Sequence, residues 1–319
     1  VGLKDEKFYG KAKDRKTVDF LAKKKIFFTI SLVMIIGGFV CMGVNKGTSG
    51  TALNYSLDFV GGTSTNVTFN EDMDLAALDS QVVPVIEKIT KDANVQVQKV
   101  AGGNQVIFKT RTLDVEERQA LTEALVENFG VNSDLITAET ISSTISSEMR
   151  SDAIVAVVIA AICMLLYIWF RFKDIRFATS SVAALIHDVL VVLAFYAVAR
   201  VSVGSTFIAC MLTIVGYSIN ATIVIFDRIR ENLAMSSGQR NMDLKEVVNK
   251  SITQTLSRSI NTSLTTFIMV FMLFILGVSS IREFAGPLMV GVICGGYSSV
   301  CITGALWYVF KTRFSKKKK

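Results

Sequence analysis

The sequence predicts an α-helical membrane protein with six transmembrane helices and an α+β domain inserted between the first and second helices. Three observations predict this class. The chain is 51% hydrophobic with a mean hydropathy of +0.47, and only 19% of its residues are charged, against about 25% in an ordinary soluble domain. Six apolar runs approach or exceed the ~18 residues that cross a bilayer as a helix. One long polar segment, 46–150, separates the first run from the other five.

The six apolar runs lie between charged residues and set the domain boundaries. They cover 26–45, Ala153–Phe170, Phe177–Ala199, Val201–Phe226, Ser259–Ile281 and Phe284–Phe310. The chain then divides into a cytoplasmic segment (1–25), helix one (26–45), an outside domain (46–150), helices two to six (151–310) and a basic cytoplasmic tail (311–319). No cleavable signal peptide is expected, because the first run follows a charged segment and lacks a small-residue cleavage site.

The distribution of Lys and Arg predicts that both termini lie in the cytoplasm. With this orientation, 24 of the 34 Lys and Arg residues fall in segments that face the cytoplasm, as the positive-inside rule requires. The basic ends are then signals for topology and for contact with the surface of the lipid bilayer. We expect no nucleic-acid partner.

Residues 46–150 have the pattern of a small folded domain. Strands are predicted at 64–69, 95–100, 105–110 and 134–140, and helices at Asp74–Lys91 and Asp114–Phe129. Pro84 interrupts the first helix, and Asp114 is a candidate N-cap of the second. The order β-α-β-β-α-β is that of a ferredoxin-like domain, which by itself assigns no function.

Two transmembrane helices carry a polar face. The residues at helical spacing are Tyr217, Asn220 and Asp227 in helix four, and Arg258, Thr262, Thr265 and Thr266 in helix five. Polar groups inside a bilayer usually face the interior of the helix bundle, so both faces are expected to line a crevice there. Arg258 has two interpretations: a fixed cation that lowers the pKa of a nearby carboxylate, or an anchor whose side chain reaches the cytoplasmic interface.

His187 and Asp188 lie about ten residues into the third run, roughly 15 Å along a helix and near the middle of the membrane. A charged Asp costs at least ~2.5 kcal/mol at that depth, so it needs a partner, a proton or a water-filled cleft. His187 is the only histidine in the chain and could relay a proton to Asp188. The alternative is a structural polar clasp between helices.

The cytoplasmic end of helix four carries alternating charges, namely Asp227, Arg228, Arg230 and Glu231. This pattern predicts an ion-pair network that closes the inner side of the bundle. The alternative is a solvated helix end without a special role.

Helix six and the cysteines are interpreted as packing features. Gly291 and Gly295 form a G-x-x-x-G pattern, which lets two helices approach closely; packing within this chain is favoured over contact with a partner. Trp307 and Tyr308 are predicted to anchor the helix at the membrane interface. The five cysteines all lie in apolar runs, and neither a metal site nor a cofactor is predicted.

Four motifs together identify a family. By itself, "LDFVGGT" (57–63) indicates only a tight turn as the chain leaves the membrane. Together with "LIHDVL" (185–190), "GYSINATIVIFDRIREN" (216–232) and "SITQTLSRSINTSLTT" (251–266), it makes the chain resemble the SecF family. These proteins are the smaller membrane subunits of the SecDF protein-translocation accessory complex, in the resistance–nodulation–division superfamily. The motif residues after helix one are Asp58, Phe59, Gly61 and Gly62.

The resemblance implies a multi-pass protein of a bacterial or archaeal cytoplasmic membrane that is not an enzyme. Such a subunit would pair with SecD, assist the SecYEG channel and its ATPase SecA, and hold or pull emerging unfolded preproteins. Proton flow through the membrane part would drive movements of the outside domain. The candidates for this proton pathway are Asp188, His187, Tyr217, Asn220, Arg258 and Thr262.

The sequence departs from the family pattern at Ala221. The resemblance implies an aspartate after the motif asparagine, as the expected protonatable carboxylate that faces the arginine of helix five. Alanine cannot bind a proton. Three explanations stay open: an engineered substitution, a lineage that uses Asp188 or a carboxylate of SecD, or a protein that works without proton coupling.

Two other functions compete with protein export. The first is a small-substrate exporter of the same superfamily, of which this chain would be one half of a dimer or a fragment, because such exporters normally have twelve helices and two outside domains. The second is a passive membrane-anchored binding module. Asp188 and the two polar helix faces argue against the passive module.

Overall fold

The computed structural model describes residues 17–92, 95–100, 103–172, 174–236 and 243–315. Two compact units divide the chain. The strand-containing unit comprises Tyr55–Ala156 and Ser202–Ser205, and the helical unit comprises the remaining residues. Predictions for residues 1–16 and for the last four lysines fall outside the described residues.

The helical unit contains the predicted membrane spans. The long helices are α1 (Lys24–Ser49), α6 (Ser143–Phe172), α7 (Ile175–Ala199), α8 (Ser205–Ser236), α9 (Leu244–Leu276) and α10 (Ser279–Ser298), and α10 continues through the π-helical turn η3 (Ser299–Thr303) into α11 (Gly304–Ser315). Within the described ranges, six segments are long and apolar enough to cross a membrane, the sixth being Ile281–Arg313. The predicted number of spans is therefore confirmed.

Several predicted helix boundaries differ from the observed ones. The second helix starts at Ser143 instead of Ala153. The fourth helix starts at Ser205 instead of Val201, because Ser202–Val203 form the short strand β6. The fifth helix starts at Leu244 instead of Ser259, with the side chain of Asp243 accepting a hydrogen bond from the Lys245 N–H as an N-cap. Charged residues mark where the apolar part of a helix ends, and α8 and α9 both extend beyond that point.

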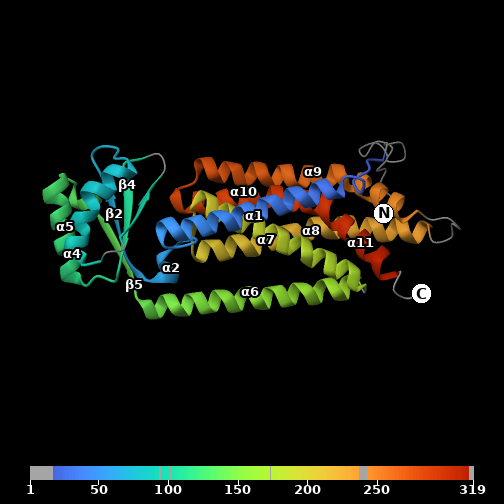
Figure 1. Ribbon diagram of the computed structural model, residues 1–319, viewed down its shortest axis with the longest axis horizontal. Helices are drawn as coiled ribbons and strands as arrows, with labels where there is room; N and C mark the ends of the chain where they lie inside the picture. Colours follow the sequence, from blue (N-terminus) through green and yellow to red (C-terminus); the bar gives the residue numbers. More distant parts are fainter. Residues whose placement is uncertain (1–16, 93–94, 101–102, 173, 237–242, 316–319) are drawn as a thin grey trace, which may run out of the picture. The chain divides into compact units, whose positions relative to one another are not determined.

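Helix α7 is the centre of the helical unit. It packs against α1, α10 and α11, and these helices run side by side in Figure 1. The backbones of α1 and α7 approach so closely that a Cβ on Gly38 would lie 2.2 Å from the Ala194 Cβ.

Trp307 differs from its predicted role at the membrane interface. It is fully buried and stacks on Phe177, with ring centroids 4.9 Å apart. The position near the end of a helix suggested an anchor, but an aromatic side chain there can equally fill the core between helices. Tyr308, the second predicted anchor, is half-buried, and Lys24 lies over its ring.

The two glycines of α10 face α8 of the same chain. A Cβ on Gly291 would lie 2.4 Å from the side chain of Ile214, and one on Gly295 would lie 3.3 Å from the Ser218 Cβ. The prediction that this G-x-x-x-G pattern packs within the chain is confirmed.

Replacing Gly291 by alanine is therefore expected to destabilise the helix bundle. The added methyl group must push α10 and α8 apart or distort Ile214, and such overpacking costs about 1–3 kcal/mol of unfolding free energy. Denaturation of the purified chain in detergent measures this loss. Gly216→Ala is the control, because an added Cβ meets nothing within 4 Å there. Equal losses from both variants would contradict the close approach.

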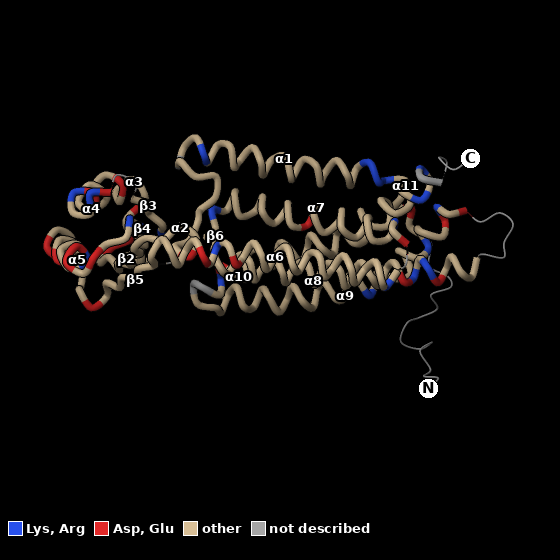
Figure 2. Tube along the Cα trace, turned by 90° about the horizontal axis from the view of Figure 1, so that it is seen from below, with Lys and Arg blue, Asp and Glu red and all other residues tan. Residues whose placement is uncertain are grey.

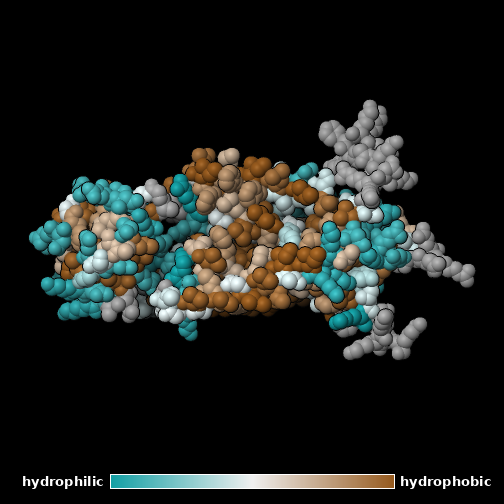
Figure 3. Space-filling model, turned by 45° about the horizontal axis from the view of Figure 1, so that its top comes forward, coloured by the Kyte–Doolittle hydropathy of each residue, from teal (hydrophilic) through white to brown (hydrophobic). Residues whose placement is uncertain are grey.

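The surface of the helical unit is suited to a membrane. Hydrophobic side chains cover most of its length in Figure 3, and many lie on α6 and α9, such as Ile159, Leu166, Ile268 and Met272. Lys and Arg gather at the end that contains the start of α1 and the end of α11 (Figure 2). This chain is thus a membrane protein by the length, composition and surface of its helices.

The strand-containing unit has one four-stranded antiparallel sheet. Its strands are β2 (Gly62–Thr68), β3 (Gln96–Lys99), β4 (Gln105–Thr110) and β5 (Thr137–Ile141), in the order β3-β4-β2-β5. The connecting helical segments are α3 (Leu75–Ala77), the π-helical turn η1 (Leu78–Val82), α4 (Val83–Thr90), α5 (Val115–Phe129) and the 3₁₀ turn η2 (Ser133–Leu135). The elements follow the predicted order, and Pro84 lies in the first turn of α4.

The core of this unit lies between the sheet and its helices. Val67 and Phe108 from the sheet pack with Ile86 of α4 and with Leu121 and Leu125 of α5, all of them buried. Alternation along β2 and β4 places these strand residues on one face. The remaining elements are β1 (Asn54–Tyr55), which pairs with β6, and the short helix α2 (Leu57–Val60).

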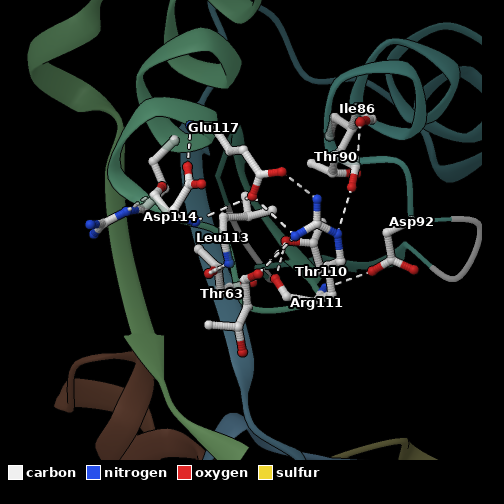
Figure 4. Close-up of polar contacts among 11 residues, drawn as sticks. Thr63, Ile86, Thr90, Asp92, Thr110, Arg111, Leu113, Asp114 and Glu117 are labelled. Atoms are coloured by element: carbon white, nitrogen blue, oxygen red, sulfur yellow. Dashed lines mark hydrogen bonds and ion pairs between the residues drawn. The ribbon is translucent and has the colours of Figure 1, made fainter.

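Arg111 joins three elements of this unit (Figure 4). Its Nε donates to the Thr90 carbonyl (2.7 Å), its backbone N–H donates to Asp92 (2.6 Å), and its guanidinium forms an ion pair with Glu117. The hydrogen bond with Arg111 lowers the pKa of Glu117. Glu117 also completes a capping box with Asp114, which confirms Asp114 as the N-cap. The end of α4, the loop after β4 and the start of α5 are thereby connected.

Candidate functional site

Asp188 lies in a buried polar cluster between α7, α8 and α10. The residue is 0% exposed. The Oδ2 atom accepts hydrogen bonds from the hydroxyls of Ser218 (2.5 Å) and Ser298 (2.8 Å). The Oδ1 atom lies 2.9 Å from His187 Nδ1 and accepts from Cys294 Sγ at 3.3 Å.

This arrangement surrounds a buried carboxylate with polar groups from three helices. Two hydroxyl groups donate to one of its oxygens, and an imidazole and a thiol lie beside the other. The His187 Nε2 atom is buried and has no hydrogen-bond partner in the described part of the chain. His187 and Asp188, the two candidates from the sequence, are thus brought together.

A metal ion is not needed to explain the cluster. Donor atoms of His187, Asp188 and Cys294 lie within 4.8 Å of one another. Both oxygens of Asp188 are, however, already satisfied by hydrogen bonds from neighbouring side chains. We therefore interpret the cluster as a hydrogen-bonded one, and the absence of a metal site stays a prediction.

A second polar site lies between α8 and α9. It is a groove of about 50 Å³ lined by Tyr217, Asn220, Ala221, Val224, Arg258, Ser259, Thr262 and Ser263. The Tyr217 hydroxyl donates to Ser263 Oγ at 2.7 Å. The side chain at position 221 and that of Arg258 line the same groove. The pairing of a carboxylate with this arginine, which the motif pattern implied, stays a prediction because position 221 holds alanine.

The expectation that these polar residues face the bundle interior is wrong for this chain on its own. Asn220, Arg258 and Thr262 are exposed, and Thr265 and Thr266 donate to carbonyls of their own helix. Consecutive helical residues point about 100° apart. Helix α8 therefore directs Ser218 toward Asp188 and Tyr217 toward α9. The single crevice predicted from the sequence is divided into a buried cluster and a surface groove.

The position of Arg258 in α9 follows from the bounds of the helix. Arg258 lies fourteen residues after Leu244, where the helix begins, so it lies roughly 21 Å along the helix. The turns before it are polar, and the apolar run begins directly after it at Ser259. Both interpretations of Arg258, the fixed cation and the interface anchor, therefore stay open.

The predicted ion pairs at the end of α8 are present. Asp227 contacts Arg171 (2.8 Å) and Arg230 (3.9 Å), and Arg228 contacts Glu231 (2.6 Å). The Arg228 Nε also donates to Gln254 Oε1 of α9 at 2.7 Å. Exposed ion pairs contribute at most about 1 kcal/mol each to stability. The network therefore positions the helix ends relative to one another and adds little to the stability of the bundle.

The motif after α1 forms the predicted tight turn. Phe59 is buried in α2, and the chain then passes through Gly61 (φ 76°) and Gly62 (φ 120°) into β2. A Cβ on Gly62 would lie 2.3 Å from the Thr110 carbonyl oxygen. Glycine is required here both by the backbone angles and by the neighbouring strand. Asp58, in α2, accepts hydrogen bonds from Ser205.

Sequence reasoning missed several members of these sites. Cys294 and Ser298 lie on a different helix from Asp188, and nothing in their local sequence connects them to it. Arg171 and Gln254 were missed for the same reason. The polar character of Ser218 within an apolar run was the available signal for its contact with Asp188.

Comparisons with known proteins agree with the motifs. The family described as protein export membrane protein SecD/SecF, C-terminal, matches residues 121–313. The chain is 36% identical over 295 residues to the protein translocase subunit SecF of Petrotoga mobilis, covering 91% of this chain and 94% of that protein. It is 35% identical over 305 residues to SecF of Calditerrivibrio nitroreducens, covering 94% and 96%.

A solved structure is similar over most of the chain. The crystal structure of SecDF from Thermus thermophilus aligns with a TM-score of 0.79 and 31% identity, over 93% of this chain. The chain spans only 39% of the length of that SecDF protein, and likewise 39% of SecDF from Bacillus subtilis, to which it is 34% identical over 302 residues.

Proposed function

The chain belongs to the SecD/SecF family of protein-export membrane proteins, and we propose that it is a SecF-type subunit that works with a SecD-type partner. Its role is in protein export. We infer that it assists SecA and the SecYEG channel in moving unfolded preproteins across the cytoplasmic membrane, without catalysing a chemical reaction itself. The family membership and the six spans support this assignment.

The orientation is part of the proposal. Both termini lie in the cytoplasm and the unit from Tyr55 to Ala156 lies outside, in agreement with the distribution of Lys and Arg. We assign this unit to the ferredoxin-like class, which is supported by its sheet order β3-β4-β2-β5. Emerging preprotein contacts this outside domain.

The groove between α8 and α9 is the proposed contact with SecD. It presents Asn220, Arg258 and Thr262 on the surface of a helix bundle that is otherwise largely hydrophobic. Polar and charged groups at membrane depth need partners other than lipid. A second membrane subunit supplies them and buries the groove.

Proton coupling passes through Asp188 in this proposal. The carrying observation is that Asp188 is fully buried near the middle of the third span and has two hydroxyls, an imidazole and a thiol around its carboxylate. Position 221 holds alanine, so it supplies no protonatable group. Ser218 and Ser298 would respond to the charge of Asp188 and alter the packing of α8 and α10 against α7.

Affinity capture tests the assignment. Solubilised membranes from the source organism are expected to yield this chain together with a larger six-helix homologue and the translocation channel, and depletion of the chain is expected to slow export of preproteins. Capture of the chain alone as a dimer, with export unchanged after depletion, would instead indicate the small-substrate exporter. Capture of the chain alone as a monomer would indicate a passive module.

A further inference from the structure

We propose that Asp58 is a positioning residue that caps the start of α8 at Ser205, a residue of the strand-containing unit, so that movements of that unit pass along the continuous helix that carries residues of all three polar sites. The purpose of such movements depends on the proposed function. The contact itself does not.

The contact is a charge-assisted helix cap supplied from a distant part of the sequence. Asp58 Oδ2 accepts hydrogen bonds from the backbone N–H of Ser205 (3.1 Å) and from its hydroxyl (2.8 Å). Ser205 is the first residue of α8, and the first N–H groups of a helix have no partner within it. A carboxylate also interacts favourably with the positive end of the helix dipole.

Position 204, directly before the capped helix, has room for glycine only. A Cβ on Gly204 would lie 2.0 Å from Ser56 Oγ and 2.9 Å from Asp58 Oδ2. The Ser56 N–H also donates to the Val203 carbonyl at 3.0 Å. Residues 56–58 and 203–205 are therefore joined by a backbone hydrogen bond, by a capped helix start and by close packing.

Both sides of the contact continue into regular secondary structure. On one side, α2 leads through Gly61 directly into β2, which pairs with β4 and β5 in the middle of the sheet. On the other side, α8 is a single helix of 32 residues. Ser218, Ala221 and Asp227 follow on this helix, so the Asp188 cluster, the surface groove and the ion-pair network all share it.

The experiment uses the chain with its partner in membranes and four variants. Asp58→Ala removes the acceptor, and Asp58→Asn keeps an acceptor oxygen without the charge. Ser205→Pro removes the N–H and the hydroxyl, while proline remains favourable at the first position of a helix. Asp79→Ala is the control, because it removes the same charge from an exposed site on the same unit.

Amide hydrogen exchange of residues 204–209 is the first measurement. Asp58→Ala and Ser205→Pro are expected to speed exchange in this turn about tenfold, equivalent to ~1.4 kcal/mol, and Asp58→Asn by less. Asp79→Ala is expected to leave it unchanged. The double variant Asp58→Ala/Ser205→Pro should be no worse than either single variant, because both remove the same interaction. Unchanged exchange in Asp58→Ala, or additive effects, would overturn the cap.

Measuring preprotein export distinguishes a positioning role of Asp58 from a purely structural one. At equal amounts of protein in the membrane, Asp58→Ala and Ser205→Pro are expected to reduce the part of export that needs the proton motive force and to spare the ATP-driven part. A loss of both parts in proportion to the protein level would show a structural role only and overturn the proposal. If exchange responds as expected but depletion of the chain never affects export, the cap stands and the proposed function fails.

Discussion

Replacing Asp188 by asparagine is expected to abolish the part of export that depends on the proton motive force, while the chain still folds and assembles. The introduced amide has nearly the size of the carboxylate. Its oxygen can accept from Ser218 and Ser298, and its NH₂ group can donate to His187 and Cys294, which surround the other oxygen. Hydrogen bonds to a neutral group are weaker, so the cost in stability is about 1 kcal/mol. The amide cannot exchange a proton.

This substitution distinguishes the two interpretations of the His187–Asp188 pair. If the pair only holds the helices together, hydrogen bonds are sufficient, and asparagine preserves them. If the pair transfers a proton, an ionisable group is required. Preprotein export is measured in cells depleted of the native subunit, with and without a proton gradient. Export that still responds fully to the gradient in Asp188→Asn would leave only the clasp.

Asp188→Ala is the matched comparison for this test. It removes the hydrogen-bond acceptor as well as the charge and leaves the buried hydroxyls of Ser218 and Ser298 without their partner. Leaving buried polar groups unsatisfied costs about 1–3 kcal/mol, so this variant is expected to lower the amount of assembled protein in addition to export. Both variants should lose the export that depends on the proton motive force, but only Asp188→Ala should also reduce the amount of assembled protein.

The fold was predictable wherever a local pattern decides the structure. Apolar runs of sufficient length predicted all six spans, and alternation predicted β2, β3 and β4 to within about two residues. The capping pattern that starts at Asp114 and the interruption at Pro84 were also correct, since both depend on backbone chemistry near the residue itself. The start of α9 was not predictable from hydropathy, because its first turns are polar and lie before the apolar run.

The site was less predictable because its parts come from different helices. A sequence shows which residues share a helix face, but not which neighbouring helix that face meets. Asp188 and Ser218 were both recognisable as polar groups in apolar runs, yet their contact depends on how α7 and α8 pack. Asn220 and Arg258 were expected inside the bundle, but a sequence pattern does not show whether a polar helix face points into the bundle or to its surface.

Replacing Ala221 by aspartate is expected to add a second protonatable group to the chain. The side chain at 221 lines the same groove as Arg258, so the new carboxylate lies close to a fixed cation that favours its charged form. Without that cation, a charged Asp inside the membrane would cost at least ~2.5 kcal/mol. The pairing offsets this cost, and the variant should therefore accumulate in the membrane at normal levels.

The functional consequence is a stronger dependence of export on the proton gradient. Each proton that crosses the membrane releases about 2.3 kcal/mol per 100 mV, so a second coupled site is expected to steepen the response of export to the membrane potential and pH difference. Ala221→Asn is the control, since it adds a polar group of the same size that cannot ionise. The double variant Ala221→Asp/Arg258→Gln separates the pair: it should lose the gain and accumulate less protein, because the carboxylate then has no cation. A gradient response of Ala221→Asp equal to that of Ala221→Asn would mean that the groove does not couple a proton to movement, and the proposed coupling would then rest on Asp188 alone.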